Sequence, residues 1–505
     1  MPFGCIIIFA MEYDVLKWFK IDNSARIYPI LHDKNGQNIF RVSYELREKA
    51  DPDALQTALR EILPKYPSFN VRMKSGFFWY FFEENRKPVK VFAEEDVKID
   101  KIDFRVNNYR LFRVSYYNAV VSFDFFHSVT DGKGGIEFSK AVVLRYFEIL
   151  GYAVEGEGLI RPFDAPSSGG EVEDSFLNNY KRMSLKDIKI KEIIGRKGYT
   201  INGLDIEDGA VGIINGICAA ADVKTAAKKY GATVTEYLSG LFIYSVYKTN
   251  YNDHNGKKPI KLLIPINLRR LLPSTTLRNF TTAAIIEADT DVKKIADGGG
   301  ETLGDKGTDI ADSGNVNLSG AAFGIAVSNN NANAGNAAAG KKASDGGIDM
   351  LSYFISVVKE QLKKSLREED IRAKVAGIAK LDKNILVKLT PLPIKYVVIK
   401  VVQGILDKLS ASNSTSVLTN PGIVDMPESM KPHIKHMSMS LIPINGTKLN
   451  CAVLTYNGEI SITFSRRYKD VGLIKFFFDA LIKAGAKLSV AGNYAELDNG
   501  EIETK

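Results

Sequence analysis

The alternation of strand-like and helix-like patterns is the feature that most limits how this chain can fold. Residues 40–46 are apolar at every second position, which is typical of a half-buried strand. Asp51-Pro52 then supplies an N-cap and a first helical residue, and residues 54–62 carry an apolar stripe with helical spacing. Pro64 ends that helix. The pattern predicts a strand followed directly by a helix.

The same order returns further along the chain. Residues 121–125 alternate as a strand that ends at His127, and a glycine-rich loop is expected at residues 131–135 before a helix over 142–150. Later elements follow from similar signals, including a capping box at Thr233-Val-Thr-Glu236 and an Asn457-Gly458 hairpin turn. They are a helix at 237–247, strands at 260–266 and 280–287, a long helical stretch at 348–381, strands at 416–424, 436–444, 449–456 and 459–465, and a helix from Asp470. This is mixed α/β.

Composition is needed to judge one segment, residues 297–347. It holds 12 Gly, 10 Ala and 7 Asn in 51 residues, with a single aromatic residue. Such a stretch buries too little apolar surface to offset its ordering entropy, so we expect a flexible insert. Its net charge is −3, and the whole chain carries +8, so the rest carries +11.

Several classes of protein are excluded or disfavoured. At 505 residues the chain needs no disulfide or metal to build a core, and three scattered cysteines support neither. No apolar run approaches the roughly 20 residues of a membrane span, and no basic region precedes the apolar start. We therefore expect a cytoplasmic protein. Residues 1–10 are interpreted as an artefactual or a frayed extension, because Met11 opens a better-formed start.

The candidate for chemistry is His127, which a strand delivers to a turn containing Asp131 and Gly132. A neutral imidazole with a pKa near 6.5 suits a general base at pH 7, so His127 is the candidate catalytic residue. Asp131 can orient His127 directly, or it can hold the turn through an arginine. The sequence leaves both alternatives open, and a structural histidine without a catalytic role is the competing interpretation.

Other patterns favour ordinary structure over function. The six aromatic residues at 77–82 are expected in a strand buried on both faces rather than on a base-stacking platform, so nucleic-acid binding is not expected. His433 and His436 lack further ligands nearby, and the stretch 335–341 lacks the Ser or Thr of a P-loop. We expect no metal site and no nucleotide hydrolysis.

His127-Ser-Val-Thr-Asp131-Gly132 resembles the HxxxDG motif of the CoA-dependent acyltransferase superfamily, which includes chloramphenicol acetyltransferase and the condensation domains of peptide synthetases. Residues 18–29, 265–280 and 419–427 resemble segments of its bacterial alcohol acetyltransferase-like branch. The resemblance implies two chloramphenicol-acetyltransferase-like lobes with mixed sheets and an active-site tunnel between them. We place the lobes at residues 11–190 and 206–505.

The resemblance also implies roles for individual residues. His127 would be the general base, Asp131 and Gly132 would support the motif, and Arg26 and Arg269 are the candidate partners of Asp131. A strand beside the cleft would carry Asn420 and Gly422.

The function implied is transfer of an acyl group, most simply acetyl, from acyl-CoA to a small-molecule alcohol or amine, with no permanently bound cofactor. Condensation domains usually have two successive histidines, and Phe126 stands at the first of these positions. A condensation-like domain that uses an acyl carrier protein is therefore the alternative. A non-catalytic binding protein of the same fold is a further one.

We expect a variant that lacks residues 297–347 to remain soluble and to unfold at a temperature close to that of the full chain, because the segment adds little to a core. Soluble expression and thermal unfolding measure this. A deletion of residues 237–247, a predicted core helix, is the control that should abolish folding. Loss of soluble expression on removal of 297–347 contradicts the interpretation of a flexible insert.

Overall fold

The computed structural model describes residues 17–31, 37–96, 99, 101–180, 196–207, 210–252, 258–291, 349–383, 389–398, 414–443 and 446–493. The expectations for residues 1–10 and 297–347 lie outside the described residues. Within these ranges, no helix is both long enough and apolar enough to cross a membrane.

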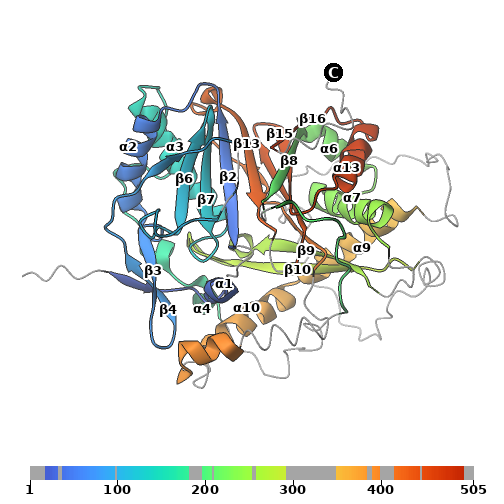
Figure 1. Ribbon diagram of the computed structural model, residues 1–505, viewed down its shortest axis with the longest axis horizontal. Coiled ribbons are helices and arrows are strands. Elements are labelled where there is room, and N and C mark those ends of the chain that lie inside the picture. The colour runs from blue at the N-terminus through green and yellow to red at the C-terminus, as the bar shows by residue number, and fades with distance from the viewer. Residues whose placement is uncertain are drawn as a thin grey trace, which may run out of the picture.

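One lobe is built around a five-stranded sheet of order β13-β2-β7-β6-β5, in which β13 comes from the last part of the chain and the other strands come from its first part (Figure 1). Helices α2 and α3 cover one face of this sheet (Figure 1). All its strand pairs are antiparallel except β5 with β6, so the sheet is mixed. The elements are β2 (Ile39–Leu46), α2 (Pro52–Ile62), β5 (Val91–Ala93), β6 (Phe112–Tyr117), β7 (Val120–Phe126), α3 (Gly132–Ile149), α4 (Ser175–Asn178) and β13 (Ile434–Leu441).

The other lobe, which starts at β8, is built around an eight-stranded sheet, with β10-β9-β11-β14-β15-β8-β16 in order across it and β12 beside β14. Parallel pairs at β11 and β12 make this sheet mixed as well. The strands are β8 (Gly212–Ala219), β9 (Ile260–Asn267), β10 (Thr281–Ala288), β11 (Ser416–Thr419), β12 (Ile423–Val424), β14 (Leu449–Tyr456), β15 (Glu459–Arg466) and β16 (Ser489–Gly492). The helices are α6 (Ala220–Lys228), α7 (Val234–Thr249), α9 (Met350–Ser365), α10 (Glu368–Lys383) and α13 (Gly472–Lys483).

A small third sheet, of order β1-β4-β3, lies at the lower left of Figure 1. Its strands are β1 (Trp18–Lys20), β3 (Val71–Ser75) and β4 (Tyr80–Glu84), and α1 (Tyr28–Leu31) follows β1 in the chain. The expectation that residues 77–82 form a doubly buried strand is wrong. Of these six aromatic residues only Phe82 is buried, because residues 76–79 turn between β3 and β4 and leave Phe77 and Phe78 exposed.

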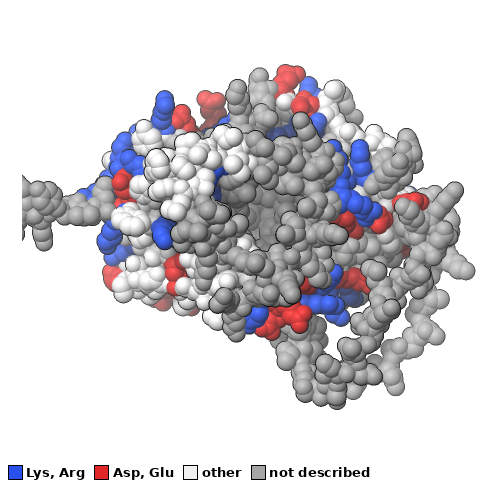
Figure 2. Space-filling view, turned by 90° about the horizontal axis from the view of Figure 1, so that it is seen from below, with Lys and Arg blue, Asp and Glu red and all other residues white. Residues whose placement is uncertain are grey.

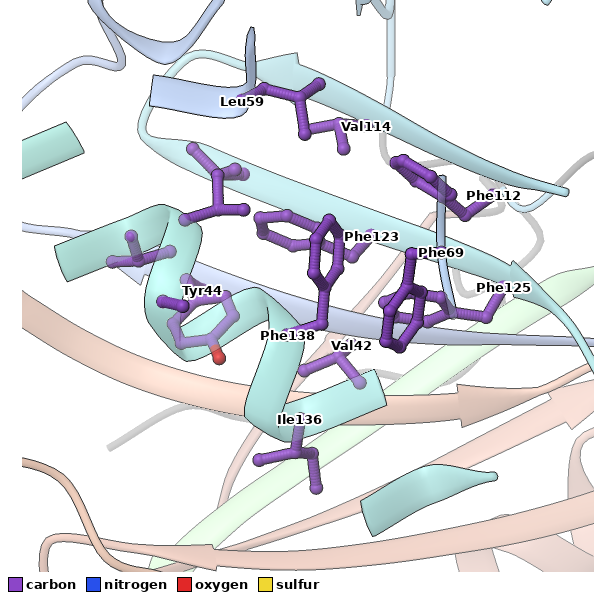
Figure 3. Packing of buried hydrophobic residues seen from close by; sticks show 14 of the residues in the cluster. Val42, Tyr44, Leu59, Phe69, Phe112, Val114, Phe123, Phe125, Ile136 and Phe138 are labelled. Atoms are coloured by element: carbon purple, nitrogen blue, oxygen red, sulfur yellow. The ribbon is translucent and has the colours of Figure 1, made fainter. Parts of the chain in front are cut away.

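Aromatic packing between α3 and the five-stranded sheet fixes how the helix lies on the strands (Figure 3). Phe138 of α3 stacks on Phe69 with ring centroids 4.3 Å apart and meets Phe112 edge-on. Phe123 and Phe125 continue this cluster on β7. Rings in such offset and edge-on contacts contribute about 0.5–1.5 kcal/mol per pair beyond the burial itself. The end of β7, where the candidate site begins, is thus held by a dense core.

Most of the predicted elements are confirmed. The capping box at Thr233 is present, with both of its hydrogen bonds, and Asn457 and Gly458 take the positive φ angles of a tight hairpin turn. The helical stretch expected over 348–381 is confirmed and consists of two helices, α9 and α10. A further expectation is wrong. The expected loop at 131–135 is the first turn of α3, because the Asp131 side chain accepts the Gly134 N–H and caps the helix.

A buried ion network crosses three strands of the five-stranded sheet. Arg41 on β2 lies opposite Asp124 on β7, and its Nε donates to Asp124 Oδ1 at 2.6 Å. Arg113 on β6 donates to the other oxygen of Asp124 at 2.8 Å. Burial pushes the pKa of Asp124 up, but the charges and hydrogen bonds of Arg41 and Arg113 outweigh it and hold the pKa below 3.8. The network therefore stabilises the fold above the unfolded pKa of Asp124 and weakens as pH falls through the native pKa.

We expect Arg41→Leu to lower the free energy of unfolding by about 3–5 kcal/mol, because it leaves the buried Asp124 carboxylate short of one partner. Urea unfolding at neutral pH measures this. Arg72→Leu is the matched control, since Arg72 pairs with Glu83 where both side chains are over a fifth exposed, and it should cost less than about 1 kcal/mol. Equal losses for the two variants would contradict the role given to the network.

Candidate active site

His127 follows directly on β7, in the first residues beyond the strand. The backbone N–H of His127 donates to the Asn38 carbonyl at 2.7 Å. The backbone N–H of Val129 donates to the Phe126 carbonyl at 2.9 Å, so the chain turns immediately after the histidine. The ring is partly exposed and lies between two aromatic side chains. Tyr28 stacks on it with centroids 4.7 Å apart, and Phe40 meets it edge-on at 5.3 Å. These contacts fix the plane of the imidazole.

Asn279 fixes which ring nitrogen of His127 carries the proton. The amide Nδ2 of Asn279 donates to the His127 carbonyl at 2.9 Å, so the Oδ1 atom is the one that faces His127 Nδ1, also at 2.9 Å. An amide oxygen only accepts, and Nδ1 must therefore be the donor. In the neutral ring this leaves the lone pair on Nε2. Among the described residues no group forms a hydrogen bond with Nε2, so that atom is available as a base.

Burial lowers the pKa of His127 below its ordinary value of 6.5. The nearby charge of Asp131 and the hydrogen bonds of the ring, including the one to Asn279, act in the opposite direction and are outweighed. The imidazole is therefore neutral near pH 7, the state in which Nε2 can accept a proton.

Asp131 is bound to three partners and none of them is His127. Its Oδ1 accepts the Gly134 N–H at 3.1 Å, and its Oδ2 accepts Arg269 Nη1 at 2.7 Å and the Phe280 N–H at 2.8 Å. The carboxylate is 1% exposed. Of the two alternatives left open by the sequence, the structure has the arginine pair. Asp131 positions the turn around His127 and influences the ring through its charge.

Glycines let two segments approach each other beside this turn. A Cβ at Gly134 would lie 2.0 Å from the Leu277 carbonyl oxygen, a distance that no side chain tolerates. At Gly132 the nearest atom would be Met439 Cε at 3.2 Å, a side-chain end that can shift. Sequence reasoning singled out Gly132. Gly134 is the position where the backbone of residue 277 leaves no room for a side chain.

The remaining sequence candidates lie elsewhere. Arg26 donates to the Ile21 carbonyl at 3.3 Å and lies over the Trp79 ring, so the partner of Asp131 is Arg269. Asn420 donates to Thr235 Oγ1 at 2.9 Å and accepts the Gly422 N–H at 2.9 Å. The bond from Gly422 closes the turn between β11 and β12, where Gly422 has a φ of +92°, and the bond to Thr235 ties this turn to α7. The structure thus brings together His127, Asp131 and Arg269, and Asn420 and Gly422 stay predictions as cleft residues.

Sequence reasoning missed Asn279, Tyr28 and Arg278 as individual residues, although all three lie in segments that carried the family resemblance. Arg278 donates to the Val172 carbonyl at 2.9 Å and lies 3.9 Å from Asp22, both buried. Burial raises the pKa of Tyr28, as do the charges of Asp22 and Asp131, so the phenol stays protonated. No periodicity or motif spacing marks these residues. The signal that could have pointed to them is their position in the chain, directly before β10 for Arg278 and Asn279 and after β1 for Tyr28.

The histidines that were weighed as metal ligands have other partners. His433 packs on Tyr152 with centroids 4.1 Å apart, and His436 Nδ1 lies 2.6 Å from Glu459. Over the described ranges no group of three or more His, Cys, Asp or Glu side chains is arranged to hold a metal ion.

We expect ¹⁵N NMR of the histidine rings to show His127 as the neutral Nδ1–H form at pH 7, with a titration midpoint below 6.5. The signal is assigned with His127→Gln. Asn279→Ala should lower the midpoint further, because the bond to Asn279 raises the pKa, and should populate the other tautomer. A His127 ring that is charged at pH 7, or protonated on Nε2, would contradict this arrangement.

No family model matches the sequence, and no curated protein sequence matches it significantly. Solved structures do resemble the fold. The nonribosomal peptide synthetase FmoA3 matches 94% of this chain at 12% identity and a TM-score of 0.55, and this chain spans 44% of that synthetase. TRI3 trichothecene 15-O-acetyltransferase from Fusarium sporotrichioides matches 92% of this chain and 93% of its own length, at 9% identity and a TM-score of 0.55.

The starter condensation domain of rhizomide synthetase RzmA, solved as a mutant in complex with C8-CoA, matches 93% of this chain and 95% of its own length at 11% identity and a TM-score of 0.50. At such low identities these likenesses concern architecture. This chain therefore has the two-lobed α/β fold that condensation domains share with a trichothecene acetyltransferase.

Proposed function

We propose that this protein is an acyltransferase that moves an acyl group from acyl-CoA to an alcohol or amine, with His127 as the general base. The observation that carries the proposal is the pair of hydrogen bonds between Asn279 and His127, which directs the lone pair of a neutral imidazole to Nε2. A histidine with a purely structural role would not need to keep Nε2 without a hydrogen-bond partner. The active-site tunnel expected between the lobes is part of the same proposal.

In the proposed reaction Nε2 of His127 accepts the proton of the acceptor hydroxyl or amine. At the same time the acceptor oxygen or nitrogen bonds to the carbonyl carbon of the thioester. The carbonyl π electrons move to oxygen and form a tetrahedral intermediate. When the C–O double bond re-forms, the C–S bond breaks, and the leaving CoA sulfur receives the proton from the imidazolium. His127 is then neutral again, and no covalent enzyme intermediate is needed.

Asp131 and Arg269 are positioning residues in this proposal. Both side chains of the pair are at most 10% exposed and their polar atoms are bonded to the surrounding backbone, so neither is expected to touch the reacting atoms. The charge of Asp131 also supports the imidazolium that forms in the transition state.

Acyl-CoA as donor is supported by two observations. One solved structure of similar fold, the RzmA starter condensation domain, is a complex with C8-CoA. The chain also carries a net charge of +8, which attracts a polyphosphorylated ligand. In this proposal acyl-CoA is a co-substrate, and no permanently bound cofactor takes part.

A second candidate function is condensation with an acyl group held on a carrier protein. The fold shared with peptide synthetases favours it. Phe126 counts against it, because this buried phenylalanine occupies the place of the first histidine of condensation domains. A fold kept for binding without catalysis is the remaining alternative, and the same experiment tests all three.

We expect purified protein to release thiol from acetyl-CoA or a longer acyl-CoA in the presence of an alcohol or amine from a panel. His127→Ala should lower turnover by about 10²–10⁴-fold, the contribution of a general base. Asn279→Ala should lower kcat by about tenfold with little change in KM, since it removes one orienting hydrogen bond. Because burial lowers the His127 pKa, activity should fall on acidification with an apparent pKa below 6.5.

His436→Ala is the matched control, since His436 pairs with Glu459 on another part of the fold, and it should keep wild-type turnover. Wild-type turnover in folded His127→Ala would refute the assignment of the base. Activity only with acyl groups on a phosphopantetheinyl carrier would favour the second candidate. A folded protein that shows no turnover with either acyl-CoA or a carrier-bound acyl group would favour a binding role.

A further inference from the structure

Exposed apolar side chains gather on one side of the molecule. Seven of the sixteen large hydrophobic side chains exposed in the described part of the chain come from two short segments, the β3–β4 turn and residues 389–398. In Figure 2, which views the molecule from below, much of the surface on the left, where Figure 1 places β3 and β4, is white. We call these seven side chains the apolar face: Phe77, Phe78, Leu389, Ile394, Tyr396, Val397 and Val398.

In the short helix at residues 392–398 the polar and apolar sides are reversed. A helix on the surface of a protein in water normally turns its apolar side inward, whereas here that side faces outward. Leu392 and Lys395 are the buried positions, so a lysine is turned inward. Ile394, Val397 and Val398 stand at i, i+3 and i+4 and are 51–58% exposed. This spacing places the three on one side of the helix. An apolar stripe that points outward indicates that something other than water covers it.

Specific contacts hold the two segments together as one surface. The Leu392 N–H donates to the Phe77 carbonyl at 2.8 Å, and Lys395 Nζ donates to the Phe78 carbonyl at 2.8 Å. The same ammonium lies 3.4 Å from the centre of the Trp79 ring. Because the lysine is used to fasten the helix to the hairpin, the side chains left to face outward are the apolar ones.

Basic side chains outnumber acidic ones on the three-stranded sheet beside the apolar face. Arg72 and Lys74 lie on β3 and Lys20 lies on β1, whereas Glu83 and Glu84 end β4. Glu83 pairs with Arg72 at 2.5 Å and lies 4.0 Å from Lys74. Lys20 and Lys74 flank Phe81 on the two neighbouring strands, and both are exposed. Aromatic and aliphatic side chains bordered by lysines match the boundary of an anionic bilayer, where rings enter the headgroup region and lysines reach the lipid phosphates.

We propose that the apolar face docks on an anionic lipid surface. The inference goes beyond the proposed function and does not depend on it, because binding to vesicles is measured without turnover. Side-chain contacts connect the β3–β4 turn to the candidate active site. The Arg26 guanidinium lies 4.8 Å from the centre of the Trp79 ring. Tyr28, two residues after Arg26 in the chain, stacks on His127.

The test is sedimentation of the full chain with vesicles of phosphatidylcholine and phosphatidylglycerol, and with vesicles of phosphatidylcholine alone. We expect binding to the mixed vesicles that weakens as salt is raised. Two double variants, Phe77→Ser with Phe78→Ser and Val397→Ser with Val398→Ser, should each reduce the bound fraction by about fivefold or more. Ile482→Ser on α13, where Ile482 is 48% exposed, is the matched control and should bind as wild type does.

Thermal unfolding establishes that each variant is folded, and the two double variants test the same face from different segments. Wild-type protein that stays in the supernatant, or folded variants of both segments that bind as wild type does, would overturn the proposal. Equal binding to uncharged vesicles would overturn its electrostatic part. A wild-type dimer in light scattering that both double variants convert to a monomer would show that a second copy covers the face instead.

Discussion

The buried carboxylate of Asp131 joins the two halves of the chain at the candidate site. One oxygen caps the first turn of α3, which belongs to the N-terminal lobe, and the other accepts from Arg269 and from the backbone just before β10. A carboxylate removed from water needs all of these partners, since losing one leaves a charge that costs several kcal/mol. The end of β7 and the start of β10 can therefore not shift independently. His127 lies between them.

The three residues directly before β10 each make a contact that holds the candidate site together. The Phe280 N–H binds Asp131, the Asn279 side chain binds His127, and Arg278 reaches the Val172 carbonyl and the neighbourhood of Asp22. Arg278 and Asn279 both approach Asp22, at 3.9 and 3.5 Å, so this short segment contacts the histidine and the region after β1 at once. Arg269 in turn donates to the carbonyls of Thr276 and Arg278 and fixes that segment.

Local patterns predicted β2 as a strand and the capping box at Thr233. The expectation that this strand is half-buried is wrong, because β2 is buried along nearly its whole length and its Arg41 is covered through its bonds to Asp124 and Glu94. The start of α3 was missed because glycines usually end helices, and its cap needs Asp131 to fold back on Gly134. The aromatic run at 77–82 was misplaced because hydrophobicity alone does not reveal a turn. Nor does any local signal encode the pairing of β13 with β2, about 390 positions apart, or the approach of Asn279 to His127. The base was therefore visible from the sequence, and the group that orients it was not.

The choice of an amide at position 279 follows from what surrounds it. Asp22 is buried nearby, with its Oδ2 3.5 Å from Asn279 Nδ2, and burial raises the pKa of Asp22 despite the opposing charge of Arg278. A carboxylate at 279 would add a third acid beside Asp22 and Asp131, could not donate to the His127 carbonyl, and would raise the His127 pKa. An amide donates with one end and accepts with the other. It orients the imidazole and leaves it neutral, which is the state in which Nε2 can act as a base.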